Sequence, residues 1–262
     1  MHNAPAPDRL LQPGEPPPVR VDNPAGRSPF LILCDHAGRV VPQRLGDLGV
    51  PAAEMDRHIA YDIGCEAVSL QMSEALDAVL IRQTYSRLVI DCNRTPGHPT
   101  SVPPVSDGTA VPGNVGLPPE AIAARVREIF DPYQDAVAAE LDRRAAAGQP
   151  AIVIGMHSFT PVYGGVTRPW QAGILHDRDP EFGLALGEVL REAGFLVGDN
   201  EPYTLTDESD YTIPVHAERR RLPYVELEIR QDLIATATGQ ADWAALLVRS
   251  LPLAAARLDL PS

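Results

Sequence analysis

Short apolar runs alternate along the chain with longer stretches in which apolar residues recur at helical spacing. Runs without polar alternation are typical of strands buried on both faces of a sheet, and they occupy 30–34, 78–81, 88–90, 151–156 and 172–175. Residues 225–229 alternate apolar with acidic positions and predict a further strand. Helical spacing predicts helices over 63–78, 119–147 (interrupted near Pro132), 180–193 and 241–257. Strands that alternate with helices indicate an α/β fold, and we expect a three-layer α/β/α sandwich around a mostly parallel mixed sheet.

The two ends of the chain differ in composition. Residues 1–27 are dense in proline and contain no hydrophobic segment, so we expect a flexible leader and no signal peptide. The remainder, 28–262, shows no repeat and no linker, and a chain of 262 residues that is 44% hydrophobic can bury one substantial core. We therefore expect a single domain there. Residues 96–118 lack periodicity and predict a long loop of the kind that often serves function.

Charge narrows the choice of partners. A formal net charge of −13 argues against nucleic acid or an anionic membrane surface as the main partner, but not against a small anionic substrate bound by local arginines. No apolar run approaches the roughly 18 residues that span a bilayer. The three cysteines, Cys34, Cys65 and Cys92, lack disulfide or CxxC spacing and are expected to be reduced, as in a cytoplasmic protein. Nothing in the sequence predicts the oligomeric state.

Two histidines stand at the ends of predicted strands. His36 and His157 follow separate buried runs, and ligand sites of open α/β sheets form at the carboxyl ends of strands. Each alone could satisfy nearby backbone, but the two together favour a divalent metal, with zinc preferred. Asp62, near the start of the next helix, is the candidate third ligand; its alternative role is a helix N-cap. Asp35 is better suited to support a neighbouring ligand.

Acidic residues on the 225–229 strand supply a candidate base. Glu228 is expected to take a proton from a metal-activated water and pass it to the leaving amine, and Glu226, on the same face, could compete for that role or orient a ligand. An exposed strand face is the alternative, but the apolar alternate positions favour a covered sheet. Ser158 lies outside any GxSxG motif, so it is not expected to be a nucleophile.

Arginines are the candidates for binding an anion. A guanidinium fork suits a carboxylate, so Arg94 is expected to bind the substrate's acid and Arg87 to polarise the scissile carbonyl or hold the oxyanion. Either could instead form an ordinary ion pair. Arg168 and His216 lie in predicted loops and are further candidates for contact with the substrate.

Several motifs taken together point to a known family. They are CDHAG (34–38), DRHIAYDIG (56–64), YSRLVIDCNR (85–94), MHSFTP (156–161), RPW (168–170), GDNEPY (198–203) and ELEIRQDLI (226–234). In order and content they resemble the N-formylglutamate amidohydrolase family, from about residue 28 to 245. That family is similar to the zinc carboxypeptidase and aspartoacylase group, so the resemblance implies a zinc-exopeptidase-like fold.

The resemblance also implies roles for individual residues. His36 matches the group's first zinc histidine, and His157 with Ser158 matches the later one; Ser158 is also expected to contact the substrate. Asn93 with Arg94 matches a pair that binds the substrate carboxylate, and Glu228 matches the general base.

One departure from the group's pattern affects the metal site. The group's carboxylate ligand lies three residues after the first histidine, where this chain has Arg39, so the third ligand must come from elsewhere. The expected reaction is metal-dependent hydrolysis of a small N-acyl acidic amino acid such as N-formylglutamate. The alternatives are a broader N-acyl amino acid deacylase, a small exopeptidase, or a non-catalytic binding protein whose metal site is degraded.

Overall fold

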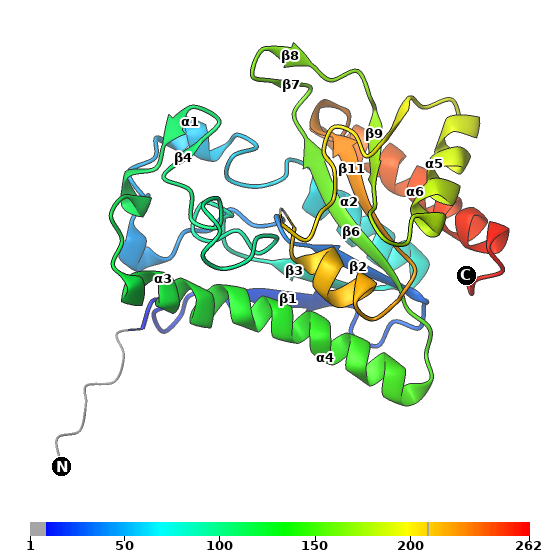
Figure 1. Ribbon diagram of the computed structural model, residues 1–262, viewed down its shortest axis with the longest axis horizontal. Helices are drawn as coiled ribbons and strands as arrows, with labels where there is room; N and C mark the ends of the chain where they lie inside the picture. The colour runs from blue at the N-terminus through cyan, green and yellow to red at the C-terminus, as the bar shows by residue number, and fades with distance from the viewer. Residues whose placement is uncertain (1–8, 209) are drawn as a thin grey trace.

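A computed structural model describes residues 9–208 and 210–262, and a mixed seven-stranded sheet runs through its centre (Figure 1). In spatial order its strands are β1 (Val19–Asp22), β3 (Val79–Gln83), β2 (Phe30–Cys34), β6 (Ile152–Phe159), β11 (Tyr224–Arg230), β9 (Ala172–Leu175) and β10 (Val197–Asp199). The central strands β3, β2, β6 and β11 are parallel, while β1 and β9 join antiparallel to β3 and β11. The expected mostly parallel α/β sheet is confirmed.

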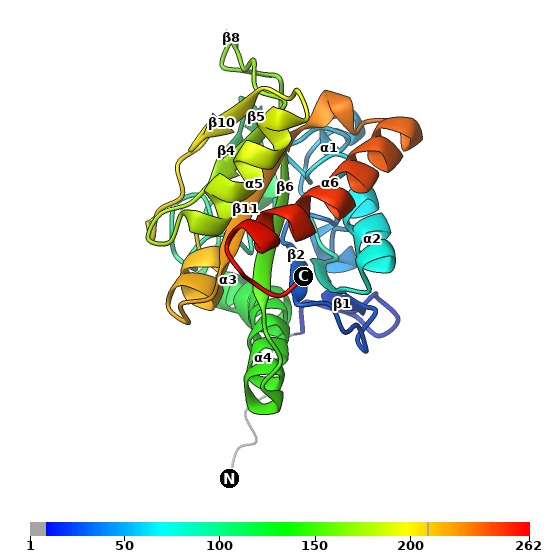
Figure 2. The ribbon, with the colours of Figure 1, turned by 90° about the vertical axis from the view of Figure 1, so that its right-hand side faces the viewer.

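Helices cover both faces of the sheet. On one face lie α2 (Cys65–Leu76), α5 (Glu181–Glu192) and α6 (Ala237–Arg257), which Figure 2 shows together in front of the strands. On the other lies α4 (Asp131–Ala147), the long helix in the foreground of Figure 1. Successive residues of a strand point to opposite faces, so Ile32 packs with the first group of helices and Leu33 with α4. This is why the central strands read as continuous apolar runs.

The segment 119–147 is helical but broken, as expected, just before Pro132. It comprises α3 (Pro119–Arg125), a π-helical turn (Val126–Phe130) and α4, whose first turn contains Pro132. Proline has no N–H to donate to the preceding turn, so the helix changes its hydrogen-bond register there.

The strand predicted at 88–90 is wrong. These residues form a buried turn in which Val89 N donates to Ser86 O. Their carbonyls accept from side chains instead of a neighbouring strand: Asn114 Nδ2 donates to Leu88 O, and Arg125 Nη1 donates to Val89 O. Burial made the run apolar, but side-chain donors from 114 and 125 replaced the ladder that a strand requires.

The expected leader, 1–27, is partly incorporated in the fold. Residues 1–8 lie outside the described part of the chain. Val19–Asp22 forms β1, and Arg82 binds Asp22 through Nε at 2.6 Å, so this stretch is an edge strand and not a flexible leader. β1 is short and pairs on one side, which gives it little sequence signal of its own.

The long loop 96–118 and the segment after β6 each contain a small hairpin. The first is β4 (Val105–Ser106) with β5 (Thr109–Ala110); the second is β7 (Val162–Tyr163) with β8 (Val166–Thr167), which projects from the body of the molecule. A short helix, α1 (Ala52–Met55), precedes α2. No helix in the described ranges combines the length and apolar character that crossing a membrane requires.

Candidate active site

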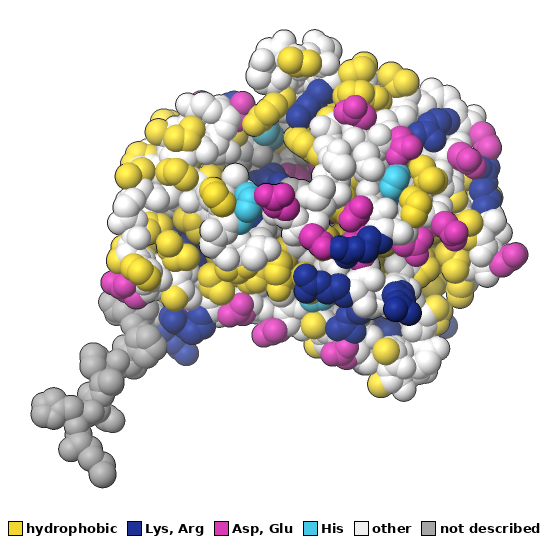
Figure 3. All heavy atoms as spheres, viewed as in Figure 1, with side chains coloured by type: hydrophobic (Ala, Val, Ile, Leu, Met, Phe, Trp, Pro, Cys, Tyr) yellow, Lys and Arg dark blue, Asp and Glu magenta, His cyan; other side chains and the backbone are white. Residues whose placement is uncertain are grey.

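A cavity of about 420 Å³ opens at the carboxyl ends of β2, β6 and β11. Most of the residues singled out in the sequence line it: His36, Asp62, Arg87, Asn93, Arg94, His157, Ser158 and Glu228. The surface in Figure 3 is hollowed below the projecting β7–β8 hairpin, and charged and histidine side chains surround the hollow. Segments far apart in the chain therefore meet at one edge of the sheet, as open α/β sheets favour.

Three donor atoms converge at the floor of this cavity. His36 Nδ1 and His157 Nδ1 are 3.2 Å apart, and Asp62 Oδ2 lies 3.0 Å from His157 Nδ1 and 3.5 Å from His36 Nδ1. All three side chains are buried, and they could together hold a metal ion. A tetrahedral zinc with bonds of about 2.05 Å separates its ligand atoms by about 3.3 Å. The observed triangle fits such an ion.

The far nitrogen of each histidine faces a carboxylate. His36 Nε2 lies 2.7 Å from Asp91 Oδ1, and His157 Nε2 lies 3.5 Å from Asp35 Oδ2. The hydrogen bond to Asp91 favours the tautomer of His36 that leaves Nδ1 as an acceptor for a metal, whereas the longer contact of His157 with Asp35 is an electrostatic one. The supporting position expected for Asp35 agrees with this geometry, and Asp91 was not assigned a role from the sequence.

The backbone between β2 and α2 brings Asp62 to the histidines. Asp62 N donates to His36 O at 2.9 Å, which ties this loop to the end of β2. Gly64, with φ +79, begins α2 as its N-cap, and a Cβ there would lie 2.1 Å from Ile234 O. Only glycine accommodates both the left-handed conformation and the close approach, so α2 starts where Asp62 can face inward.

Asp62 is not a helix cap. Its Oδ2 accepts from Ser158 N at 3.1 Å, while α2 has no side-chain cap. Burial works to raise the pKa of Asp62, but the positive charges and hydrogen bonds of His36 and His157 outweigh it, and the pKa is lowered. Ser158 Oγ donates to Ile63 O, so both polar groups of Ser158 hold the Asp62 loop.

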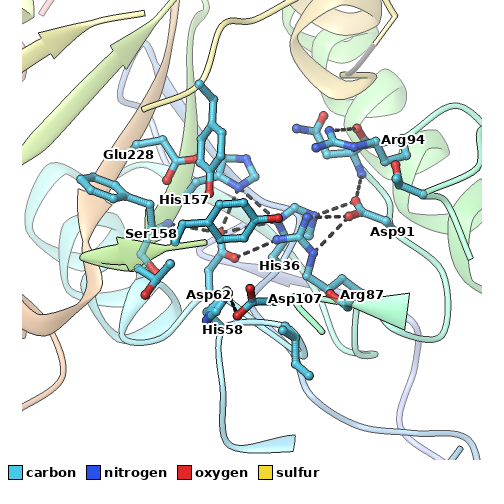
Figure 4. Close-up of a pocket in the computed structure, with 18 of the residues that line it drawn as sticks. His36, His58, Asp62, Arg87, Asp91, Arg94, Asp107, His157, Ser158 and Glu228 are labelled. Atoms are coloured by element: carbon cyan, nitrogen blue, oxygen red, sulfur yellow. Dashed lines mark hydrogen bonds and ion pairs between the residues drawn. The ribbon is translucent and has the colours of Figure 1, made fainter. Parts of the chain in front are cut away.

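Glu228 and Glu226 extend from β11 into the same cavity. Glu228 is paired in register with His157 across β6 and β11, and Figure 4 shows its side chain beside that histidine. Its Oε2 is buried and has no hydrogen-bond partner within 9–208 and 210–262. Burial raises the pKa of Glu228 to about 7, with His157 opposing the rise. Burial and the charge of Asp210 raise the pKa of Glu226 well above its usual value.

Arg87 is surrounded by acids. Its Nε and Nη2 donate to Asp91 Oδ2 at 3.1 and 2.7 Å, and its Nη1 lies 3.4 Å from Asp62 Oδ1. Figure 4 follows this chain of contacts from Asp62 through Arg87 to Asp91 and on to His36. The guanidinium thus stabilises one metal-ligand candidate directly and the other through Asp91.

Asn93 and Arg94 are also engaged by the protein. The amide oxygen of Asn93 accepts from the backbone N–H groups of Tyr211 and Thr212, and its Nδ2 donates to Asp210 Oδ1 at 3.3 Å. Arg94 Nη1 donates to Asp210 Oδ1 at 2.9 Å and to Asn93 O at 2.8 Å. The pair borders the cavity, but it is bound first to the loop around Asp210.

The two further candidates for substrate contact, His216 and Arg168, lie in different places relative to the cavity. His216 lies in a π-helical turn (Pro214–Glu218) and not in the predicted loop, and it is buried outside the cavity lining. Its Nε2 lies 2.8 Å from Gln134 Oε1, and burial and Arg220 lower its pKa to about 4. The expected substrate contact of His216 is therefore not supported by its position. Arg168 lies between Tyr163 and Tyr203, both of which line the cavity.

Comparison with known proteins identifies the group to which this arrangement belongs. The sequence pattern of the N-formylglutamate amidohydrolase family matches residues 28–235. The chain belongs to that family. No curated protein matches the chain at a significant level. The family resemblance inferred from the motifs is confirmed, and an amidohydrolase family supports a hydrolytic enzyme.

Two solved structures resemble the amidohydrolase fold described here. A gene product from Agrobacterium tumefaciens is 37% identical, with a TM-score of 0.93 over 96% of this chain and 100% of its own. The N-formylglutamate amidohydrolase from Ralstonia eutropha JMP134 is 20% identical, with a TM-score of 0.62 over 93% of this chain and 99% of its own. The second likeness concerns the fold alone.

Sequence reasoning missed three residues of this amidohydrolase site. Asp91 lies four residues after Arg87 and supports His36; Asp210 neutralises Arg94; Tyr203 lies at the rim. Asp91 and Tyr203 fall inside the family motifs 85–94 and 198–203, which was the available signal. Asp210 lies outside those motifs, and only the folded chain brings it to Arg94.

Proposed function

We propose that the chain hydrolyses the amide bond of a small N-acyl acidic amino acid such as N-formylglutamate, with a divalent metal, preferably zinc, at His36, Asp62 and His157. The observation that carries the proposal is the buried triangle of two imidazole nitrogens and one carboxylate oxygen, with sides of 3.0–3.5 Å. Three protein ligands with room for water are typical of catalytic zinc. The proposed fold relationship is to the zinc exopeptidases.

The proposed mechanism assigns proton transfer to Glu228. A divalent ion held by the triad would supply Lewis acidity to the attacking water and the acyl carbonyl. Glu228 takes the proton from that water and later donates it to the leaving nitrogen, which frees formate and the amino acid. Its buried oxygen without a partner in the described chain and its pKa of about 7 suit a group that gains and loses a proton near neutrality. Glu226 remains the competing candidate, and its higher pKa favours the protonated form.

The proposed roles of the arginines follow from their partners. Arg87 orients Asp62 and Asp91 and can approach the developing oxyanion, since its side chain is partly exposed to the cavity. Asn93 and Arg94 border the acidic half of the substrate, and Arg94 retains donors beyond the Nη1 that Asp210 accepts. Ser158 serves the substrate indirectly by holding Asp62. A cavity of about 420 Å³ suits a small substrate. We further propose that the protein acts in the cytoplasm, in keeping with its reduced cysteines.

Metal content provides the direct test. Protein purified without a histidine tag should contain one equivalent of a divalent metal by elemental mass spectrometry, and a chelator should abolish hydrolysis of N-formyl-L-glutamate until the metal is restored. His36→Ala and His157→Ala should each lose the metal. His176→Ala is the matched control, because His176 binds Asp199 outside the cavity lining. Stoichiometric metal in the double variant of His36 and His157, or hydrolysis unaffected by chelation, would refute the assignment.

A further inference from the structure

Three arginines at or beside the cavity differ in how fully the protein neutralises them. Arg87 and Arg94 line the cavity, whereas Arg168 contacts Tyr163 and Tyr203, which line it. Arg87 has Asp91 and Asp62, and Arg94 has Asp210. No carboxylate of the described residues forms an ion pair with Arg168, although Arg168 is only 9% exposed. Burying a guanidinium without an anionic partner is costly, so such a group is suited to an anion that arrives from outside.

Aromatic rings hold Arg168 where a carboxylate would otherwise be needed. Its guanidinium carbon lies 4.8 Å from the centre of the Tyr163 ring and 4.6 Å from that of Tyr203. Arg168 N donates to Pro161 O at 2.8 Å, which closes the base of the β7–β8 hairpin and brings Tyr163 to the same place. Stacking on two π faces stabilises the cation but leaves the donors at its edge available.

Tyr203 connects this cation with the interior of the cavity. Arg168 Nη1 donates to Tyr203 Oη at 2.9 Å, so the hydroxyl proton of Tyr203 is free to point at another acceptor. Burial, followed by the charge of Glu228, raises the pKa of Tyr203, which keeps that proton in place at neutral pH. Tyr203 itself lines the cavity, as do Glu228 and Arg87.

We infer that Arg168 and Tyr203 form the receptor for a carboxylate of the substrate, with Tyr163 as the second wall of the guanidinium's slot. The inference rests on the proposed function, because it assigns one of the two carboxylates of that substrate to the rim of the cavity. Arg168 offers the fork and Tyr203 an O–H donor, a combination that binds a carboxylate through charge-assisted hydrogen bonds. Inside the cavity, Asp91 and Asp62 already bind Arg87, and Asp210 binds Arg94, which leaves Arg168 as the arginine best placed to gain an anionic partner.

Binding to the metal-free protein tests the receptor apart from the chemistry. Calorimetric titration with N-formyl-L-glutamate should give affinities that fall at least about 30-fold in Arg168→Gln and about tenfold in Arg168→Lys, which keeps the charge and loses the fork. Tyr203→Phe keeps the ring and should lose about tenfold, as for one hydrogen bond to a charged group. Arg82→Lys is the control: Arg82 is as buried, at 8%, but it pairs with Asp22 and Glu66, which do not line the cavity as Tyr163 and Tyr203 do. It should bind like the native protein.

Neutralised ligands show which carboxylate is bound. N-formyl-L-glutamine lacks the charge of the side-chain carboxylate, and the α-amide of N-formyl-L-glutamate lacks the charge of the α-carboxylate. One of the two should bind the native protein as weakly as N-formyl-L-glutamate binds Arg168→Gln, and should lose little more affinity in that variant. Additive losses with both ligands, native affinity in the Arg168 variants, or no binding to the native protein would each overturn the receptor. Circular dichroism of every variant confirms the fold, and Arg168→Lys covers the case in which Arg168→Gln does not fold. Hydrolysis that survives chelation would refute the metal mechanism and leave this binding result unaffected.

Discussion

The metal-ligand side and the arginine side of the cavity are built in opposite ways. At the floor, three donor atoms face one another at 3.0–3.5 Å, and Asp91 and Asp35 lie at the far side of each histidine. At the arginine side, the protein occupies its own charges, since Asp210 binds both Asn93 and Arg94. The chemical type of a residue beside the cavity therefore does not by itself show which of its atoms are available to a ligand. The role of such a residue depends on whether other protein groups already bind its donor or acceptor atoms, and those groups are distant in sequence.

The largest expected effect is at Glu228. Glu228→Gln keeps the shape of the side chain and removes the base, so kcat should fall by about 10²- to 10⁴-fold while the metal stays bound. Steady-state kinetics with N-formyl-L-glutamate and elemental analysis of the same samples measure both. Glu226→Gln is the matched variant on the same strand face. A larger loss of kcat in Glu226→Gln than in Glu228→Gln would move the base to Glu226.

The supports of the two histidines should have the next largest effect. Asp91→Asn removes the carboxylate 2.7 Å from His36 Nε2, and zinc affinity should weaken about 10- to 100-fold. Asp35 lies farther from its histidine, at 3.5 Å, so Asp35→Asn should weaken zinc binding less. Competition with a chromophoric chelator measures the affinities.

Asp107→Asn serves as the control for both supports. Asp107 lines the cavity but pairs with Arg57, so its loss should leave zinc affinity unchanged. Equal zinc affinity in all three variants would show that the carboxylates do not support the histidines.

The fold could be predicted where one physical requirement dominates the local sequence. Strands buried on both faces need continuous apolar residues, so the runs of β2 and β9 were found to the residue. β6 continues three residues beyond its predicted end and includes His157. The run 88–90 satisfies the same requirement without being a strand, because Asn114 and Arg125 supply the hydrogen bonds. β1 was missed for the opposite reason: it is a strand because it pairs with β3, and its own residues carry no strand pattern.

The residues of the candidate site also differ in how far the sequence predicts them. His36, His157 and Glu228 follow from strand ends and from strand alternation, and all three line one cavity. The sequence left Asp62 open between a ligand and a cap, and only the turn at Gly64 separates the two. His216 was predicted to be a loop residue free to bind substrate, but it lies in a π-helical turn (Pro214–Glu218) and is buried against Gln134. One turn of helix is too short to give a periodic signal in the sequence.

The pH dependence of stability tests whether His216 is structural. Its pKa is about 4 in the folded protein, against about 6.5 for an unperturbed histidine, so the unfolded state binds the proton more readily. The stability it contributes is complete above pH 6.5 and is lost as the pH falls from 6.5 towards 4. Between pH 7 and pH 5 this loss should amount to about 2 kcal/mol.

Denaturant unfolding of the metal-free protein at both pH values measures the loss. His216→Gln should remove most of this contribution, whereas His98→Gln, which changes a partly exposed histidine, should retain it. The same pH dependence in His216→Gln as in the native protein would show that His216 is not held neutral by the fold.

The smallest expected effect is at Arg94, on the arginine side of the cavity. Arg94→Lys keeps a cation that Asp210 can still bind. In the native protein Arg94 Nη1 already donates to Asp210 and to the backbone oxygen of Asn93. We therefore expect KM for N-formyl-L-glutamate to rise by only about threefold with kcat unchanged, which is within the range of a weak, screened contact. Amidation of a substrate carboxylate should cost the Arg94→Lys variant as much as it costs the native enzyme, because independent sites add. If instead Arg94→Lys raises KM tenfold or more and amidation then costs little extra, the substrate carboxylate displaces Asp210 from Arg94. In that case the arginine side would resemble the metal side, with Asp210 holding the guanidinium ready for a ligand.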